Sequence, residues 1–317
     1  MIEVFAVVAP VFAMIAIGYV CARLGFVSEA AERLITRLVF GVAIPTLLFR
    51  TMANITAPDV SPWGLWGAYF GGIAITGIVT FALVRQIVKA GPAEASIAAL
   101  GAGYSNTVLI GIPLIFSFFG EAQSAVPLFI ILSIHLPVMM IVGTLSVEWC
   151  NAGARRTDMV TLLVLTGKAI ITNPIILGLL SGLIYRQTGW GIIAPIQVAI
   201  DAVAWIAVPA ALLTMGVSLN RFGVTGQAPI CGVMLLTKLV LHPLAVAVLV
   251  FWVFDLPEVW GAVAILFAAA PTGVNVFLLA SRYQIAVPAV SAAIAIGTAC
   301  SLITITLISW AMGFQGA

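Results

Sequence analysis

The chain has 317 residues, of which 63% are hydrophobic and 8% are charged, and its mean hydropathy is +1.22. A soluble domain carries about 25% charged residues, so this composition excludes a soluble enzyme or binding domain. The net charge of +2 gives no indication of a nucleic-acid partner. Apolar stretches of about twenty residues, each able to cross a hydrocarbon core of roughly 30 Å, recur along the chain and predict an all-α polytopic membrane protein.

Ten membrane spans follow from these stretches. They are expected at residues 3–22, 32–51, 63–84, 95–119, 124–147, 160–185, 196–217, 228–253, 259–280 and 286–312. The first stretch has no basic region before it and no small-residue cleavage site after it. It is therefore interpreted as a span and not as a signal peptide.

The basic residues predict the orientation of these spans. Only Arg50 and Arg186 lie beside even-numbered loops, whereas the odd-numbered loops hold Arg23, Arg33, Arg37, Arg85, Lys89, Arg155, Arg156, Arg221 and Arg282. Because Lys and Arg favour the cytoplasmic side, the odd-numbered loops are expected inside and both termini outside the cytoplasm.

The four cysteines predict neither a disulfide framework nor a metal site. Cys21, Cys150 and Cys231 fall near the predicted cytoplasmic face, and Cys300 falls inside the last span. The reducing side of the membrane disfavours disulfides, and the spacing of the cysteines matches no metal motif. No cofactor is expected.

The sequence divides into two halves of five spans each, residues 1–150 and 158–317. The run Ala43-Ile44-Pro45 in the second span resembles Ala207-Val208-Pro209 in the seventh. Since five is an odd number, the second half enters the membrane from the opposite side, and the halves are expected to form inverted repeats. Interruptions at corresponding places of such repeats typically mark the binding site of a transporter.

The fourth and ninth spans carry matched interruptions. The residues concerned are Gly103, Ser105, Asn106, Thr107, Gly111 and Pro113 in the fourth span, and Pro271, Thr272, Gly273 and Asn275 in the ninth. Proline lacks an N–H group and glycine permits unusual backbone geometry, so both spans are expected to open. Open backbone at bilayer depth must be buried in protein or line a wet cavity, and half-helix starts suit a carboxylate. The alternative is that Gly and Pro only kink these helices.

Several segments resemble the auxin efflux carrier family. "NTVLIGIPL" (residues 106–114) and "PTGVNVFLLASRY" (residues 271–283) are similar to its two crossover signatures, and "NPIILGLLSGL" and "TKLVLHPL" also resemble it. The resemblance implies that helices 4 and 9 cross where they are broken. It also implies a dimerising scaffold of helices 1, 2, 6 and 7, and a transport domain of helices 3–5 and 8–10 that moves as an elevator. Plant members have proline at the position of Ser105, so the resemblance favours a bacterial inner-membrane member.

Four ionisable side chains fall inside spans, namely His135, Lys168, Lys238 and His242. Such residues are costly in lipid and usually face the protein interior or a water-filled path. Lys238 is expected to contribute positive charge to a substrate site, and the other three are candidates for ion coupling. Alternatively, Lys168 extends to the cytoplasmic surface and the histidines serve only in packing. No carboxylate pair lies at mid-membrane, so the interior suits an anion better than a cation.

These features predict a secondary carrier of small organic anions, such as malonate, malate or auxin-like acids, and not an enzyme. Asn106 and Asn275 are expected to bind the substrate, with help from Ser105, Thr107 and Thr272. A sodium-coupled anion symporter like the bile acid carriers is the closest rival, and a channel or a membrane sensor is the alternative of another class. Coupling to protons or to sodium stays open, and the homodimer rests on the resemblance alone.

The orientation can be tested by labelling. In a variant without native cysteines, a cysteine placed at Ala317 should react with a membrane-impermeant maleimide from the outer side of spheroplasts. A cysteine at Lys89, on a predicted cytoplasmic loop, should react only after the membrane is permeabilised. Labelling of the Ala317 position from the cytoplasmic side alone would overturn the orientation and the inverted repeat with it.

Overall fold

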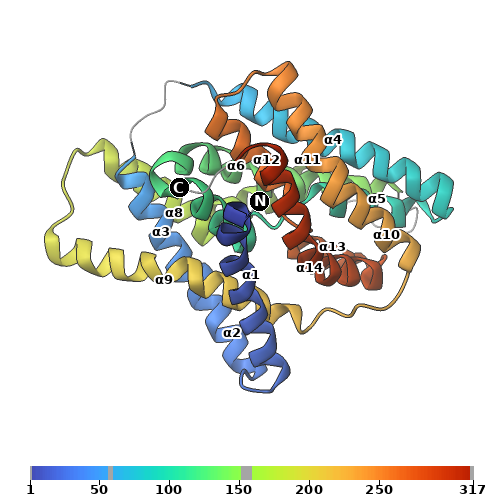
Figure 1. Ribbon diagram of the computed structural model, residues 1–317, viewed down its shortest axis with the longest axis horizontal. Helices are drawn as coiled ribbons and strands as arrows, with labels where there is room; N and C mark the ends of the chain where they lie inside the picture. Colours follow the sequence, from blue (N-terminus) through green and yellow to red (C-terminus); the bar gives the residue numbers. More distant parts are fainter. Residues whose placement is uncertain (1, 56–59, 151–158, 315–317) are drawn as a thin grey trace.

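The computed structural model describes residues 2–55, 60–150 and 159–314 (Figure 1). Arg155 and Arg156, on which part of the predicted orientation rests, lie outside these ranges, as does Ala317, the position proposed for labelling. The elements in the described ranges are α-helices and short π-helical segments, the latter labelled η. In chain order they are α1 (Ile2–Arg23), α2 (Glu29–Leu38), η1 (Val39–Ala43), α3 (Ile44–Ala53), α4 (Pro62–Leu83), η2 (Val84–Val88), α5 (Pro92–Gly103), η3 (Thr107–Gly111), α6 (Ile112–Cys150), α7 (Met159–Thr172), α8 (Pro174–Gln187), α9 (Ala194–Leu219), α10 (Ala228–Leu236), η4 (Thr237–Leu241), α11 (His242–Val248), η5 (Leu249–Val253), α12 (Glu258–Ala269), α13 (Val274–Tyr283) and α14 (Val287–Ala311).

The helices confirm a polytopic α-helical membrane protein. Seven of the described helices, counting directly joined segments as one, are long and apolar enough to cross a membrane: α1, α2 to α3, α4 with η2, η3 with α6, α9, α10 to η5, and α14. The spans expected at 95–119, 160–185 and 259–280 are each interrupted, after Gly103, at Asn173 and after Ala269. The total of ten spans therefore stays a prediction.

The longest helix, α6, contains a kink where the fourth and fifth spans were expected to meet. Gly120 has φ 67° and ψ 164° there, a conformation that side chains with a Cβ rarely adopt. Glu121 directly follows this kink, and Pro127 and Pro137 lie further along the helix. The kink thus separates α6 into two helical parts.

Prolines and short polar side chains mark where several helices begin. Pro62, Pro92 and Pro174 each occupy the first position of a helix, where the missing N–H group has no intrahelical acceptor in any case. At the start of α8, Asn173 Oδ1 accepts hydrogen bonds from the N–H groups of Ile175 and Ile176. The break between α7 and α8 is therefore encoded locally by the Asn-Pro pair.

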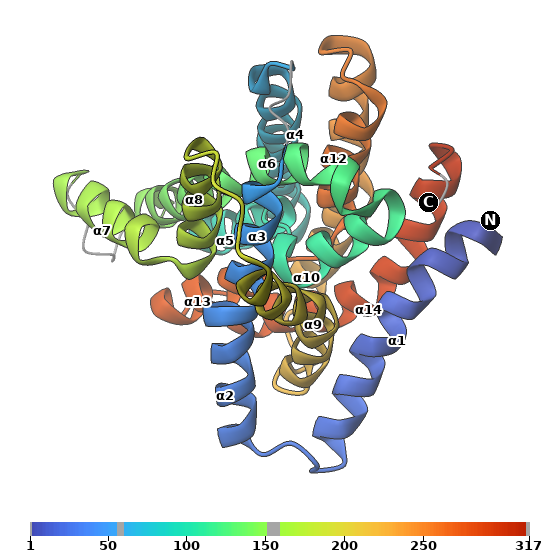
Figure 2. The same cartoon turned by 90° about the vertical axis from the view of Figure 1, so that its left-hand side faces the viewer.

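The helices pack in two sets that meet along a seam. In the first set α1 contacts α9, and α3 contacts both α8 and α9; in the second set α4 contacts α5 and α11, α12 contacts α6, and α10 contacts α14. Figure 2 shows α1 and α2 extending below the body of the molecule, whereas α4 extends above it. The division into a scaffold and a transport domain, which the family resemblance implies, stays a prediction.

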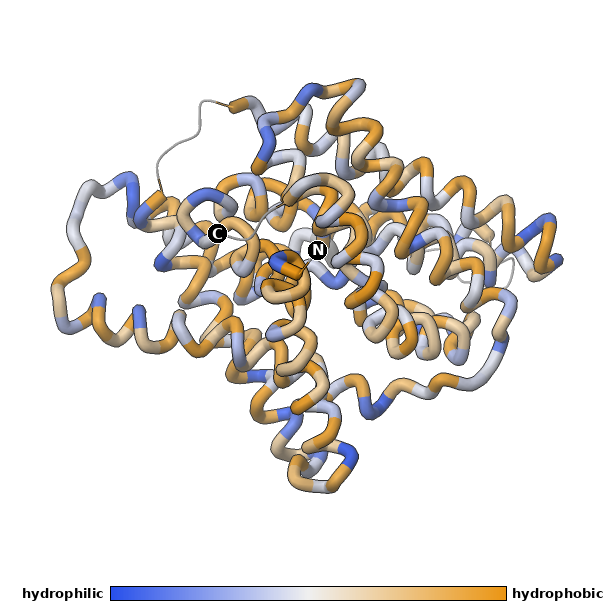
Figure 3. Tube along the Cα trace, viewed as in Figure 1, coloured by the Kyte–Doolittle hydropathy of each residue, from blue (hydrophilic) through white to orange (hydrophobic). Residues whose placement is uncertain are grey.

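Many large apolar side chains lie on the outer surface of the described chain. Figure 3 shows hydrophobic residues along all helices, with hydrophilic residues chiefly at turns and helix ends. Large apolar side chains such as Ile78, Trp205 and Trp252 are exposed. On a soluble monomer such continuous apolar surface would favour aggregation, whereas in a bilayer it contacts lipid.

Glycine allows the closest helix contacts of the first set. A Cβ atom at Gly216 of α9 would lie 1.9 Å from the carbonyl oxygen of Ile15 in α1, and one at Gly178 of α8 would lie 2.4 Å from the carbonyl oxygen of Pro45 in α3. Small residues at such contacts let helix backbones approach closely, which strengthens packing where lipid supplies no hydrophobic driving force.

The close contact between Gly216 of α9 and the Ile15 carbonyl of α1 generates a stability prediction. Gly216→Ala should lower the melting temperature of the detergent-purified protein, because the new methyl group must push α1 away at a cost of about 1–3 kcal/mol. Gly232→Ala is the matched control, since nothing lies within 4 Å of the added Cβ. In the control, removal of a glycine from a helix interior should leave stability unchanged or raise it by about 0.5–1 kcal/mol. Equal melting temperatures for the two variants would contradict the close contact.

Candidate functional site

Two interrupted segments from opposite halves of the chain lie against each other. Residues 104–106 separate α5 from η3, and residues 270–273 separate α12 from α13. The Asn106 N–H donates to the Pro271 carbonyl at 2.8 Å, and the Gly273 N–H donates to the Tyr104 carbonyl at 2.8 Å. Ser105 and Thr272 thereby form an antiparallel bridge. We call residues 104–106 and 270–273 the bridged pair.

The sequence of each segment explains why the bridged pair forms. Pro271 has no N–H to donate, so it does not extend α12, and its carbonyl accepts from the other segment. A Cβ at Gly273 would lie 3.0 Å from the Ser105 carbonyl oxygen, so glycine permits the close approach. A Cβ at Gly111 would lie 2.5 Å from the Phe267 ring, and one at Gly103 would lie 2.8 Å from the Ile73 side chain. Because the two segments satisfy each other, open backbone is tolerated here.

The side chains at the bridged pair also satisfy helix ends. Thr272 Oγ1 donates to the Gly101 carbonyl at 3.0 Å, near the end of α5. Asn106 Oδ1 accepts from the Leu109 N–H at 3.3 Å at the start of η3, and Asn106 Nδ2 lies 3.3 Å from Met215 Sδ of α9. Asn275 is half-buried, and its Nδ2 donates to the Tyr104 hydroxyl at 2.8 Å.

A cavity of about 230 Å³ adjoins the bridged pair. It lies at the seam, because η1 and α8 line one side and the segments around η3 and α13 line the other. Three helical segments begin at this cavity: η3 at Thr107, α8 at Pro174 and α13 at Val274. Helix starts carry partial positive charge and N–H groups without intrahelical acceptors, so the cavity is suited to an anion.

The structure separates the predicted site residues into two groups. Those that line the cavity are Ser105, Asn106, Thr107, Gly273, Asn275 and His135. Those that do not line it are Thr272, Lys238, Gly103, Gly111, Pro113, Pro271, Lys168 and His242. Lys168 is exposed on α7, in agreement with the alternative that it extends to a surface. Thr272 and Pro271 instead hold the bridged pair together from behind the cavity.

Two further polar residues of the cavity were missed from the sequence. Tyr104 and Asn173 both line it. The signal for Asn173 was the Asn-Pro pair inside an apolar span, which resembles the polar interruptions of the fourth and ninth spans. Tyr104 directly precedes the Ser-Asn-Thr stretch, but its side chain could equally have faced lipid.

His135 lies at the wall of this cavity between aromatic rings. Its side chain is buried, and its ring centroid lies 4.9 Å from that of Tyr104 and 5.6 Å from that of Tyr69. Neither ring nitrogen has a hydrogen-bond partner among the described residues. Buried imidazole nitrogens usually have partners, so a ligand or a water molecule in the cavity would complete this site. No group of three or more metal-ligating side chains occurs in the described part of the chain.

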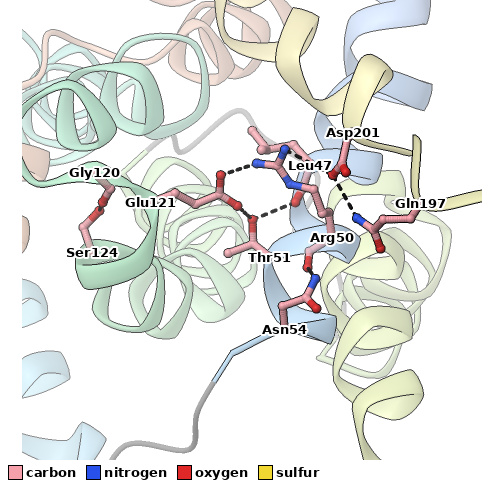
Figure 4. A network of polar contacts seen from close by, with 9 residues as sticks. All are labelled: Leu47, Arg50, Thr51, Asn54, Gly120, Glu121, Ser124, Gln197 and Asp201. Carbon is pink, nitrogen blue, oxygen red and sulfur yellow. Dashed lines mark hydrogen bonds and ion pairs between the residues drawn. The ribbon is translucent and has the colours of Figure 1, made fainter. Parts of the chain in front are cut away.

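A second polar cluster lies further along the same seam (Figure 4). Arg50 of α3 forms an ion pair with Glu121 of α6 and a second one with Asp201 of α9, at 3.7 Å. Thr51 donates a hydrogen bond to Glu121 as well, and Gln197 donates to Asp201 at 2.9 Å. We call these five residues the Arg50 cluster. It could have been predicted, because its three charges all lie beside loops expected on the same side of the membrane.

Comparison with known proteins gives the family. A family model described as a membrane transport protein matches residues 3–309. A protein of Rhizobium meliloti (strain 1021) described as "Putative malonate transporter" is 27% identical over 307 residues, which cover 96% of this chain and 95% of the relative.

The bridged pair generates a second stability prediction. Thr272→Val should lower stability by about 1–3 kcal/mol, because the Gly101 carbonyl loses its hydroxyl donor while it stays buried. Thr298→Val is the matched control: Thr298 is equally buried, but its hydroxyl bonds Ile294 one turn back in α14, where the helix already supplies a donor. Thermal unfolding of both purified variants checks this. An equal loss of stability in Thr298→Val would show that the effect of Thr272→Val is common to buried threonine hydroxyls and does not depend on the bridged pair.

Proposed function

Because the chain belongs to the membrane transport protein family, the auxin efflux carrier family of the sequence resemblance, we propose that it is a secondary carrier of small organic anions. The proposed substrates are mono- or dicarboxylates such as malonate or malate. The name of the Rhizobium meliloti relative supports a short dicarboxylate. The observation that carries the proposal is the small cavity beside the bridged pair, where several polar side chains lie among apolar ones and three helical segments begin.

The size and lining of the cavity favour a small anion. Its volume of about 230 Å³ lies below the roughly 300–1,000 Å³ of pockets for drug-sized ligands. The cavity is lined by the amides of Asn106, Asn173 and Asn275 and by the hydroxyls of Ser105 and Thr107. Amides and hydroxyls donate hydrogen bonds, and helix starts add partial positive charge. A carboxylate can therefore be bound without a buried counter-charge in contact with it.

The location of the cavity supports alternating access. Phe40 and Ile176 come from the first packing set, and Asn106 and Asn275 come from the second. A site between two packing sets opens to either side of the membrane when one set moves against the other. We propose that the chain forms two inverted five-helix repeats, residues 1–150 and 158–317. The helices of the second set carry the substrate as an elevator past a dimerising first set.

The remaining parts of the proposal concern the cell. The carrier is proposed to lie in a bacterial inner membrane with both termini outside the cytoplasm, on the basis of the charge bias of the loops. It performs no covalent chemistry on its substrate, so its site residues are binding residues only. Saturable counterflow of labelled malonate in liposomes would distinguish a carrier from a channel.

The proposal is tested first by ligand screening. A carboxylate that binds only the folded protein raises its melting temperature in proportion to the logarithm of ligand concentration. Malonate, succinate, malate, acetate and indole-3-acetate should be compared, with matched concentrations of the corresponding amides as uncharged controls. Stabilisation by at least one acid and by none of the amides is expected. No stabilisation by any acid, together with no counterflow, would contradict an organic-anion carrier.

The two asparagines of the bridged helices give the sharpest binding prediction. Asn106→Ala and Asn275→Ala should each weaken binding of the stabilising acid by roughly ten- to a hundred-fold, because one hydrogen bond to a charged ligand contributes about 1.5–3 kcal/mol. Titration calorimetry of the purified variants measures this.

Asn220→Ala serves as the control, because Asn220 is exposed at the end of α9 away from the cavity. It should bind as the unmodified protein does. If both site variants also bind normally, the asparagines only satisfy the backbone at the breaks.

A further inference from the structure

Lys238 is buried where the two halves of the protein meet. It lies in the π-helical segment η4, and its side chain is 1% exposed. Its Nζ atom lies 2.6 Å from Ser105 Oγ, 2.9 Å from the Ala268 carbonyl oxygen and 2.9 Å from His242 Nδ1. None of the ion pairs in the described part of the chain includes Lys238. A buried ammonium without a carboxylate partner needs an explanation, because its desolvation costs several kcal/mol.

These three partners can accept all three hydrogen bonds that the Lys238 ammonium group is able to donate. An ammonium group has three donors and no acceptor, and a hydroxyl oxygen, a carbonyl oxygen and an imidazole nitrogen can each accept one bond. Ser105 belongs to the first segment of the bridged pair, and Ala268 lies in the last turn of α12, directly before the second segment. A single Nζ atom thus contacts both interrupted helices.

The C-terminal end of α12 favours a bound cation. Its last carbonyl groups have no intrahelical donor, and the helix dipole makes this end negative. In membrane carriers with interrupted helices, such ends and the unwound carbonyls beside them typically coordinate the coupling ion. The corresponding end of α5 is satisfied differently: its Gly101 carbonyl accepts from the neutral Thr272 hydroxyl. The end of α12 is thus met by an ammonium group, whereas the end of α5 is met by a neutral hydroxyl.

We propose that the Lys238 ammonium is a tethered cation that occupies the position of a coupling sodium ion at the end of α12. It joins the two interrupted helices permanently, and transport consequently proceeds without sodium. The consequence for transport rests on the proposed carrier function, whereas the cation site itself does not. Lys238 is then a positioning residue, because it acts on the substrate through Ser105, which lines the cavity, and does not line the cavity itself.

The first test uses the unmodified protein. Its melting temperature in sodium chloride should equal that in choline chloride of the same ionic strength, and the affinity for the stabilising carboxylate should agree within about two-fold in the two salts. A higher melting temperature or tighter carboxylate binding in sodium would overturn the proposal, because a sodium site would then exist beside Lys238.

The second test removes the tethered cation. Lys238→Ala should melt at a lower temperature than the unmodified protein, and ammonium, methylammonium or sodium ions should restore about half or more of the loss, because the vacated space then takes a free cation. Choline, which is too large for that space, should restore nothing. Lys168→Ala is the matched control from an exposed lysine, and its melting temperature should not respond to these cations.

These measurements separate the cation site from the carrier function. The melting experiments contain no substrate, so a cation response in Lys238→Ala supports the tethered cation even if no carboxylate binds. A folded, monodisperse Lys238→Ala protein that responds to none of the small cations overturns it. If Lys238→Ala does not fold, Lys238→Arg, which keeps the charge, should fold, and the sodium comparison on the unmodified protein still decides.

Discussion

Two backbone hydrogen bonds between the interrupted helices hold the centre of this protein together. They run from Asn106 to Pro271 and from Gly273 to Tyr104, and so join segments that lie about half the chain apart. Each unpaired backbone group at bilayer depth would cost several kcal/mol, so neither interruption is stable without the other. The cavity, the start of η3, the start of α13 and the position of Lys238 all depend on this pairing. The candidate site therefore lies where two helices are interrupted.

The candidate site combines several polar side chains with a cavity lining that includes no Asp, Glu, Lys or Arg among the described residues. The cavity is lined by amides, hydroxyls and helix starts, while the Lys238 ammonium lies one shell behind it and is bound by protein acceptors. A carrier must release its substrate as readily as it binds it. For the proposed carboxylate substrate, neutral donors would provide selectivity without the very tight binding that a direct ion pair in a low-dielectric site would give. The arrangement would thus favour release of the substrate over its retention.

Sequence reasoning succeeded where local chemistry alone decides the structure. Proline and glycine at Pro271 and Gly273 interrupt a helix in almost any surroundings, so the breaks could be located within a few residues. The contacts of Lys238 could not be predicted in the same way, because hydropathy gives the depth of a side chain but not its direction. The contribution of Asn173 depends on how α8 packs against α3, which local sequence does not determine. The total of ten spans and the inverted repeat still rest on charge and hydropathy.

The Arg50 cluster has a mechanical consequence for any movement along the seam. Arg50 is shared by Glu121, which belongs to α6, and by Asp201, which belongs to α9 and stays beside α3 because these two helices pack together. If α6 moved away from α3 in the proposed transport cycle, the guanidinium would keep Asp201 as a partner, whereas Glu121 would lose both Arg50 and Thr51 and would need water or another donor. The shared guanidinium would thus favour the resting arrangement of the two sets, and the cost of leaving that arrangement would fall on Glu121 and not on Arg50.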